Sequence, residues 1–327
     1  MSAQPNGSPR KETEKKRELR DDRIRKRKTG GEDYPLSATM TVNPSLIGVL
    51  GAGTMGSGIA QVCAQAGFET LLYDVSQQFI DNGLGRIRSF LQRSRARGKI
   101  TAEEEKQILE RLISTLQLED FRECALVIEA APEQIDLKRD MFKKLDALCP
   151  PDALLATNTS SFSVTAIAGA TRQPERVLGM HFFNPPPLMA LVEIIRGDRT
   201  SPATMEKAIS IARQIGKTPV AAKDTPGFIV NRIARPFYNE ALRILGDGQA
   251  EVEAIDRIMK EAGGFPMGPF ELMDLIGIDI NFAATQSLHQ SFFYDSRFRP
   301  SPIQQRMALA GNLGRKTGRG FYTYGEK

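Results

Sequence analysis

Two polar side chains, His181 and Glu193, interrupt otherwise apolar segments of the sequence. His181 lies in Gly-Met-His-Phe-Phe-Asn-Pro-Pro-Pro at the end of a predicted strand, and Glu193 lies within the next one, Leu-Val-Glu-Ile-Ile. A carboxylate in such a run is costly to bury unless it is paired. A strand, a proline turn and a second strand could bring the two together, so that Glu193 fixes one imidazole tautomer and His181 acts as a general base. Taken alone, a histidine beside two phenylalanines is more often a structural core residue.

Two further polar sites stand out. Thr-Asn-Thr-Ser-Ser, residues 157–161, follows a predicted strand, and ligands bind at the carboxyl ends of strands in doubly wound sheets. The alternative is that Ser160 or Ser161 only caps a helix. Asn231 lies in Pro-Gly-Phe-Ile-Val-Asn-Arg, at the first helix of the C-terminal part, where the alternative is a solvated helix residue.

A glycine-rich loop indicates a dinucleotide site. Residues 51–56, Gly-Ala-Gly-Thr-Met-Gly, fit G-x-G-x-x-G between a strand and a helix. The glycines permit a tight turn, close approach to a pyrophosphate and close helix packing, while the helix N-terminus favours the phosphates. Asp74 ends the following strand, 23 residues after Gly51, and its carboxylate would bind the ribose hydroxyls and repel a 2′-phosphate. This pattern favours NAD.

The elements around these residues predict an α/β fold. Short apolar runs predict strands, and longer runs with helix-like composition predict the helices between them. We expect strands at 46–50, 69–73, 126–129, 153–156, 176–180, 191–195 and 218–222, and helices at 55–66, 77–97, 101–114, 134–148 and 202–215. The remainder has the pattern of helices with Gly/Pro breaks. We therefore expect a Rossmann-type doubly wound, mainly parallel sheet at 40–224, followed by an all-helical C-terminal domain at 225–327.

Composition excludes several other classes of protein. The 327 residues are 41% hydrophobic and 25% charged, as in ordinary soluble proteins, and no apolar run reaches the roughly 18 residues of a membrane span. Cys63, Cys124 and Cys149 form no C-x-x-C pair, so we expect buried thiols in a reducing, cytoplasmic setting. With two histidines, His181 and His289, imidazole-based metal chemistry is disfavoured.

The basic charge of the chain belongs mainly to its first residues. Residues 1–39 hold 11 Lys/Arg and 7 Asp/Glu, a net charge of +4, which leaves +1 for the other 288 residues. We expect a disordered, solvated tail, because so few apolar residues cannot offset the entropy of ordering. Its acidic residues argue against a mitochondrial transit peptide, and translation could instead begin at Met40. A nucleic-acid partner is not favoured.

Several longer motifs resemble the 3-hydroxyacyl-CoA dehydrogenase family, in particular its bacterial 3-hydroxybutyryl-CoA dehydrogenases. They occur in family order between about residues 45 and 324. The motifs are GAGTMGSGIA (51–60), VIEA (127–130), TNTSS (157–161), HFFNP (181–185), PGFIVNR (226–232), PMGP (266–269) and GRKTGRGFY (314–322).

The resemblance implies reversible NAD-dependent oxidation of an acyl-CoA 3-hydroxyl, in a homodimer formed through the helical domain and without membrane or nucleic-acid partners. It implies His181 as catalytic base with Glu193 as its partner, and Ser160 and Asn231 as contacts of the substrate oxygen. The residues it implies around NAD are Gly51, Gly53, Thr54, Met55, Gly56, Asp74, Glu133, Lys138, Asn158 and Ser160.

The sequence departs from the family pattern at a few positions and leaves two alternatives. Pro186 stands where a small aliphatic residue is common, and Phe265 where histidine is frequent. No enoyl-CoA hydratase region is present, so we do not expect the fused multifunctional form. Ser160, His181 and Glu193 could instead form a thioester hydrolase triad, although Ser160 lacks a G-x-S-x-G elbow. A non-catalytic NAD- or RNA-binding protein that uses the basic tail is the other alternative.

Overall fold

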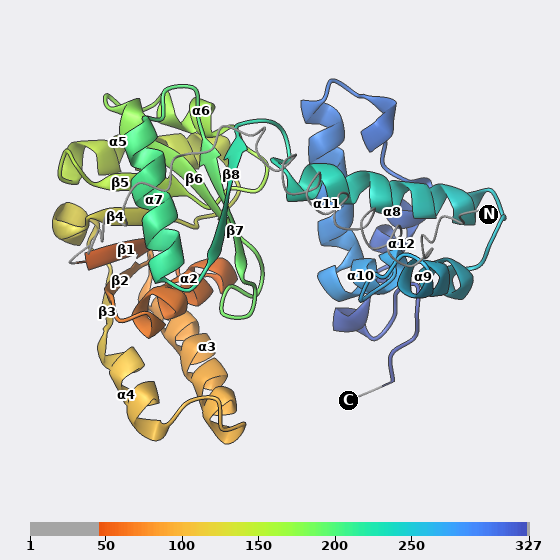
Figure 1. Ribbon diagram of the computed structural model, residues 1–327, viewed down its shortest axis with the longest axis horizontal. Helices are drawn as coiled ribbons and strands as arrows, with labels where there is room; N and C mark the ends of the chain where they lie inside the picture. The colour runs from red at the N-terminus through yellow and green to blue at the C-terminus, as the bar shows by residue number, and fades with distance from the viewer. Residues whose placement is uncertain (1–45, 326–327) are drawn as a thin grey trace, which may run out of the picture. The chain divides into compact units, whose positions relative to one another are not determined.

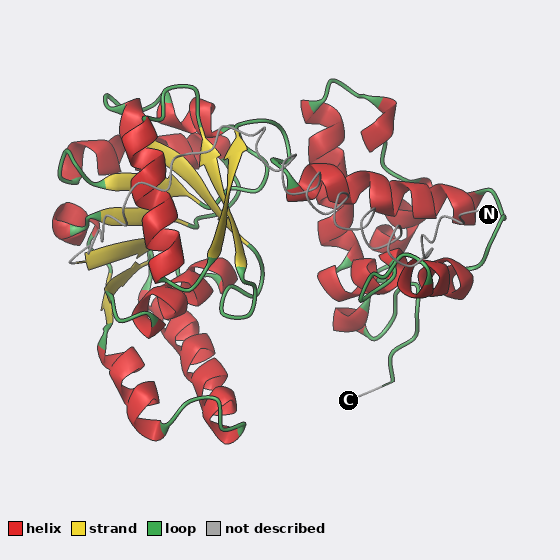
Figure 2. Ribbon diagram, in the orientation of Figure 1, coloured by secondary structure: helices red, strands yellow, loops and turns green. Residues whose placement is uncertain are grey.

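The computed structural model describes residues 46–325, and the predicted tail, residues 1–39, lies outside them. The N-terminal part is one eight-stranded sheet in the order β3-β2-β1-β4-β5-β6-β7-β8 (Figures 1 and 2). All neighbouring strands are parallel except β6 and β7, which are antiparallel. The strands are β1 (Leu46–Leu50), β2 (Glu69–Tyr73), β3 (Leu112–Thr115), β4 (Leu126–Glu129), β5 (Leu154–Thr157), β6 (Val177–Phe182), β7 (Leu191–Arg196) and β8 (Thr218–Lys223).

Helices cover both faces of the sheet, which confirms the doubly wound prediction. On one face lie α2 (Thr54–Gln65) and α7 (Pro202–Gln214), and on the other lie α5 (Ile135–Leu148) and α6 (Val164–Ala168) (Figure 1). The second face is packed by a buried cluster that includes Phe121, Phe142 and Ile167, together with strand residues such as Val127 and Leu155. Because these strands are covered on both sides, they read as nearly continuous apolar runs.

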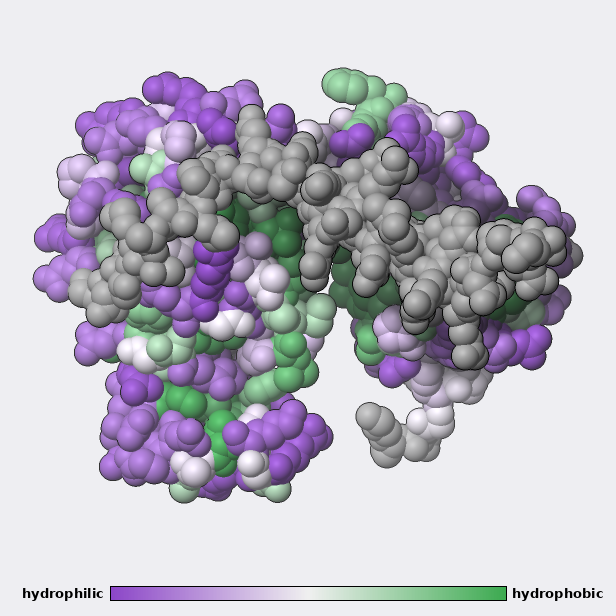
Figure 3. All heavy atoms as spheres, viewed as in Figure 1, coloured by the Kyte–Doolittle hydropathy of each residue, from purple (hydrophilic) through white to green (hydrophobic). Residues whose placement is uncertain are grey.

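Two helices, α3 (Gln77–Ala96) and α4 (Ala102–Glu110), connect β2 to β3. Ile87, Leu91 and Ile108 are buried in a shared cluster, and Figure 3 shows hydrophilic atoms on the outer surfaces of both helices with apolar atoms between them. Of the two helices predicted here, the first agrees to within one residue at its C-terminal end, since it was expected at 77–97.

The prediction of one helix across 101–114 is wrong in its last turn. The helix begins at a capping box of Thr101 with Glu104 and ends at Glu110. Leu112 to Thr115 instead form the edge strand β3, which pairs in parallel with Thr70 to Tyr73 of β2. Four residues that include the β-branched Ile113 and Thr115 suit a short strand, and pairing with β2 decides the outcome.

The C-terminal part is helical, as predicted. Its core holds the buried side chains of Tyr238, Leu242, Phe270 and Met273. The helices are α8 (Val230–Gly246), α9 (Val252–Glu261), α10 (Pro269–Ile276), α11 (Ile278–Ser291) and α12 (Pro302–Leu309). The 3-10 helices of the described chain are η1 (Leu118–Glu123), η2 (Pro174–Arg176), η3 (Ser296–Phe298) and η4 (Arg315–Thr317).

Two of the compositional predictions can be compared with the structure. Cys63, Cys124 and Cys149 are free thiols and all three are buried, as expected. Within residues 46–325, no helix combines the length and the apolar character that crossing a membrane would require.

Candidate active site

His181 and Glu193 are directly opposite each other on the antiparallel strands β6 and β7. Opposite residues in such a pair project from the same face of the sheet, so their side chains meet. Nδ1 of His181 lies 2.7 Å from Oε2 of Glu193. The two side chains are almost inaccessible, with 6% of His181 and 1% of Glu193 exposed. The strand, proline turn and strand predicted from the sequence therefore do bring the pair together.

The second carboxylate oxygen of Glu193 binds the start of the helical part. Oε1 accepts hydrogen bonds from the backbone amides of Ile229 and Val230, each at 2.9 Å. Val230 is the first residue of α8, where a helix has unpaired amides and a positive dipole end. Burial opposes ionisation of Glu193, but the hydrogen bonds from His181 and from these amides outweigh it and hold the pKa of the carboxyl below its usual value.

These contacts fix how the imidazole can act. An ionised carboxylate can only accept hydrogen bonds, so in the neutral imidazole of His181 the proton lies on Nδ1 and Nε2 keeps its lone pair. The rings of Phe183 and Phe228 lie 4.6 Å and 5.7 Å from the imidazole ring, measured between centroids. The pair thus has the arrangement of a general base whose tautomer is set by a buried acid.

The segment before α8 is shaped to reach this pair. Gly227 and Phe228 both have positive φ, 73° and 47°, which is uncommon for a phenylalanine. The Phe228 side chain is buried with Val164 and Ile195, so packing against the sheet region offsets the backbone strain. Asn231 follows as the second residue of α8 and is partly buried. Within residues 46–325, no hydrogen bond joins Asn231 to His181 or Ser160.

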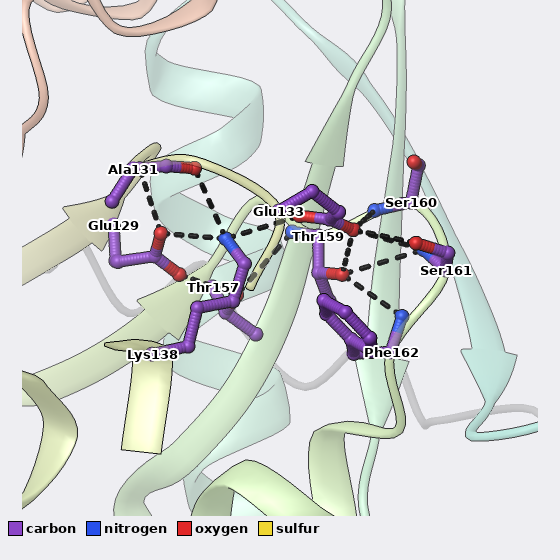
Figure 4. Close-up of polar contacts among 9 residues, drawn as sticks. All are labelled: Glu129, Ala131, Glu133, Lys138, Thr157, Thr159, Ser160, Ser161 and Phe162. Carbon is purple, nitrogen blue, oxygen red and sulfur yellow. Dashed lines mark hydrogen bonds and ion pairs between the residues drawn. The ribbon is translucent and has the colours of Figure 1, made fainter. Parts of the chain in front are cut away.

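Ser160 lies in a turn that Glu133 holds (Figure 4). The Ser160 amide donates to Oε1 of Glu133 at 3.1 Å, while its hydroxyl points away from that carboxylate. The alternative interpretation, a helix cap at Ser160 or Ser161, does not hold, because Ser163 caps α6 by accepting a hydrogen bond from the Ala166 amide. The turn at 157–161 is therefore available for another role.

Lys138 and Asn158 are held by contacts within the protein. Nζ of Lys138 lies 2.7 Å from Glu129 and 3.2 Å from Glu133, and its side chain is 1% exposed. Oδ1 of Asn158 accepts a hydrogen bond of 2.8 Å from the amide of Phe182, the neighbour of His181. Glu129 is a residue that the sequence interpretation did not single out. The same sequence feature that identified Glu193, an acidic residue within an apolar strand, could have identified Glu129.

The glycine loop has the shape that a dinucleotide needs. Gly51 has φ of 105°, and a Cβ on Gly56 would lie 1.7 Å from the Gly51 carbonyl oxygen, so neither position has room for a side chain. A Cβ on Gly53 would meet nothing within 4 Å. Gly53 and Thr54 are exposed, and no side chain caps α2. The first amides of α2 are thus open to a phosphate, and Met55 lies in the same turn.

Asp74 lies at the carboxyl end of β2, beside this loop. Its Oδ2 accepts a hydrogen bond from the Ala52 amide and its Oδ1 one from the Val75 amide, both at 2.7 Å. The carboxylate is therefore tied to the glycine loop itself. The residues of this site fit a dinucleotide whose pyrophosphate lies at α2 and whose ribose lies at Asp74.

The family comparison agrees with this geometry. Residues 46–225 match the 3-hydroxyacyl-CoA dehydrogenase NAD binding domain, and residues 227–324 match the C-terminal domain of the same family. The chain belongs to the 3-hydroxyacyl-CoA dehydrogenase family. As a member of that family it is an oxidoreductase, and its cofactor is NAD.

Curated members of the family are similar over most of this chain. Identity is 47% over 277 residues with the probable 3-hydroxybutyryl-CoA dehydrogenase of Deinococcus radiodurans, covering 85% of this chain and 99% of that protein. It is 46% over 285 residues with the 3-hydroxyadipyl-CoA dehydrogenase of Escherichia coli, covering 87% of this chain. The chain spans 60% of the length of that Escherichia coli protein.

Solved structures of the family share the fold. A 3-hydroxybutyryl-CoA dehydrogenase from Escherichia coli aligns with a TM-score of 0.84 and 45% identity, over 88% of this chain and 61% of that chain. The (S)-3-hydroxybutyryl-CoA dehydrogenase of Ralstonia eutropha aligns with a TM-score of 0.82 and 41% identity, over 87% of this chain and 100% of that chain.

The lowered pKa of Glu193 predicts a specific acid dependence of stability. A carboxyl with a folded-state pKa below its usual 4.5 stabilises the protein above that value, and this contribution is lost as pH falls through the folded-state pKa. We expect Glu193→Gln to unfold at lower urea concentration than the wild type at neutral pH. The difference in unfolding free energy should shrink as pH falls below 4.5. A difference that stays constant through this range would contradict the assignment.

Proposed function

We propose that this protein catalyses the reversible oxidation of (S)-3-hydroxyacyl-CoA to 3-ketoacyl-CoA with NAD, and that 3-hydroxybutyryl-CoA is its substrate. The observation that carries the proposal is the buried contact of 2.7 Å between His181 and Glu193 in a chain of this family. The names of the similar proteins from Deinococcus radiodurans and Ralstonia eutropha support the short acyl chain.

His181 is the general base of the proposed reaction. Its Nε2 removes the proton of the 3-hydroxyl, and the imidazolium that forms is stabilised by the carboxylate of Glu193. The chemistry that bound NAD would supply is acceptance of the hydride from C3 of the substrate. In the reverse direction, His181 returns the proton to the oxygen of the 3-keto group.

Ser160 and Asn231 orient the reacting oxygen in this proposal. The Ser160 hydroxyl points away from Glu133 and is not used to cap α6. Asn231 follows the two residues whose amides bind Glu193, which ties its place in the chain to the catalytic pair. Each side chain can donate a hydrogen bond to an oxygen that becomes more negative during the reaction.

The cofactor is held mainly by main-chain groups. The open turn at Gly53, Thr54 and Met55 would hold the pyrophosphate, and Asp74 would hold the ribose hydroxyls. Gly51 and Gly56 let this turn form, and Glu133, Lys138, Asn158 and Ser160 line the other end of the cofactor site. We assign the NAD-binding domain to residues 40–224 and the helical domain to residues 225–327.

A cytoplasmic location completes the proposal. The three thiols are free and buried, and burial raises the pKa of Cys63 to about 12, which keeps it protonated and unreactive. Nothing in this set of cysteines calls for an oxidising compartment.

The two alternative functions lack support. Within residues 46–325, no hydrogen bond joins Ser160 to His181, as a hydrolase triad would need. The similar proteins named above are dehydrogenases. The basic tail on which nucleic-acid binding would depend lies outside the described residues.

The first activity prediction concerns His181. We expect the wild type to reduce acetoacetyl-CoA with NADH. The reaction is followed by the loss of NADH absorbance. His181→Ala should lower kcat by about 10²–10⁴-fold, the range that general acid–base catalysis contributes. The affinity for NADH, measured by fluorescence titration, should stay near that of the wild type. No oxidation by the wild type with short or longer 3-ketoacyl-CoA would refute the proposed function.

We also propose a homodimer through the helical domain. Several apolar side chains of that domain are exposed, including Ile280, Phe293 and Leu309 at 55%, 92% and 82%. Association with a second copy of this domain would remove such side chains from water. Light scattering should give a particle of twice the 36.1 kDa chain mass. A mass of one chain at micromolar concentration would contradict the dimer.

A further inference from the structure

Residues 224–229 join β8 to α8 and are called the linker below. The C-terminal end of the linker is held by the catalytic pair, because the amides of Ile229 and Val230 donate to Oε1 of Glu193. Its N-terminal end is held by the sheet, because the amide of Asp224 donates to the carbonyl oxygen of Arg196, the last residue of β7, at 3.2 Å. The side chain of Asp224 adds a third attachment.

The carboxylate of Asp224 accepts three hydrogen bonds from the start of α6. Its Oδ2 accepts one from Oγ of Ser163 and one from the amide of Thr165, both at 2.7 Å. Its Oδ1 accepts one of 3.0 Å from the amide of Val164. A helix leaves its first amides unpaired, and its N-terminus favours a carboxylate. Asp224 therefore bonds the linker firmly to this end of α6.

Between its two ends the linker folds into a tight turn. The amide of Phe228 donates to the carbonyl oxygen of Thr225 at 2.9 Å. Pro226 and Gly227 occupy the central positions, and Gly227 has φ of 73°, as in a type II turn. The side chain of Phe228 is 4% exposed and packs in one cluster with Val164, the first residue of α6. An apolar contact thus supports the hydrogen bonds of Asp224.

The two segments that Asp224 bonds together carry the two proposed contacts of the reacting oxygen. Ser163, at the start of α6, is three residues after Ser160 in the chain. Asn231, the second residue of α8, comes directly after the linker and Val230. The separation of Ser160 from Asn231 therefore depends on how the linker is held against α6.

Glu193 alone would fix a point on the linker but not the direction of the helix that follows. It binds the chain immediately before Asn231, and Gly227 permits a wide range of backbone angles on the other side of that contact. Asp224 is a second anchor, placed before Gly227. Two anchors fix the direction in which α8 begins, and with it the side from which Asn231 approaches the reacting oxygen.

We propose that Asp224 is a positioning residue for the reaction, which sets the place of the Asn231 side chain relative to the Ser160 hydroxyl by bonding the linker to α6. This inference rests on the proposed function, because it takes both side chains as contacts of the reacting oxygen. Two donors stabilise a developing negative charge only when both reach the same atom. An error of about 1 Å in such a position can cost about 10²-fold in rate.

The experiment uses two substitutions to separate this geometry from the stability of α6. Asp224→Ala removes all three hydrogen bonds, so both Tm and kcat should fall. Asp224→Glu keeps a carboxylate for the helix end but is longer by a methylene group, so it should recover most of the Tm while it displaces the linker. We expect its kcat with acetoacetyl-CoA and NADH to stay roughly 10-fold to 10²-fold below that of the wild type.

A double-mutant cycle with Asn231→Ala tests the route of the effect. If Asp224 acts through Asn231, adding Asp224→Glu to Asn231→Ala should lower kcat no further. The nitrogen-15 NMR signals of the His181 ring should be the same in Asp224→Glu as in the wild type, because the linker amides stay on Glu193. The NADH dissociation constant should also be unchanged, because Asp224 is not one of the residues assigned to the cofactor.

Asp198→Ala is the matched control. Asp198 is exposed and also bonds the start of α6, but through its main-chain amide, which donates to Oγ1 of Thr165 at 3.0 Å. The substitution removes a nearby carboxylate and keeps this hydrogen bond, so kcat should not change.

Three results would overturn the inference. A kcat of Asp224→Glu within about threefold of the wild type would leave Asp224 only a structural cap of α6. Altered His181 ring signals in that variant would show that the effect passes through Glu193. Multiplicative losses from Asp224→Glu and Asn231→Ala would show that Asp224 does not act through Asn231. The proposed function would fail differently, by a wild type that does not reduce acetoacetyl-CoA.

Discussion

The carboxylate of Glu193 joins the parts of this protein that must act together. It is buried in a strand, where a charge survives only if donors surround it. Those donors are the His181 imidazole on the adjacent strand and the first amides of α8, Ile229 and Val230. One charge therefore fixes the imidazole tautomer and anchors the start of the helical part beside it. The antiparallel pairing of β6 with β7 places position 193 opposite position 181.

A second buried carboxylate repeats this arrangement on the parallel part of the sheet. Glu129 ends β4 and accepts hydrogen bonds from the Ala131 amide and from the Lys138 and Thr157 side chains. Asp74 follows β2 and accepts them from main-chain amides. At the carboxyl edge of the sheet no side chain caps α2, and Lys138 links Glu129 to Glu133, which binds the Ser160 turn. The residues proposed for catalysis and cofactor binding thus contact acids that are buried, as Glu193 and Glu129 are, or partly buried, as Asp74 is.

The sequence predicted every strand of the sheet except β3, and the meeting of His181 with Glu193, because apolar runs and a proline turn are local signals. It missed β3, since Leu112–Thr115 become a strand only by pairing with β2. It did not identify Glu129 or the hydrogen bonds that join the turn at 159–161 to Glu133, because the partners lie up to 28 residues away in the chain. Likewise, Ser163 rather than Ser160 caps α6, a choice that depends on where that helix begins. The contacts between segments that are distant in the chain therefore could not be predicted from the sequence.

Measurement of the His181 tautomer tests most directly whether Glu193 orients the imidazole. Nitrogen-15 NMR of histidine-labelled protein, at a pH where the imidazole is neutral, distinguishes a protonated Nδ1 from a protonated Nε2. The chain has two histidines, and His289→Gln would assign the signals of His181. We predict a proton on Nδ1 and a bare Nε2, and a changed spectrum in Glu193→Gln. A proton on Nε2, or rapid exchange between the two tautomers, would contradict the central role of Glu193.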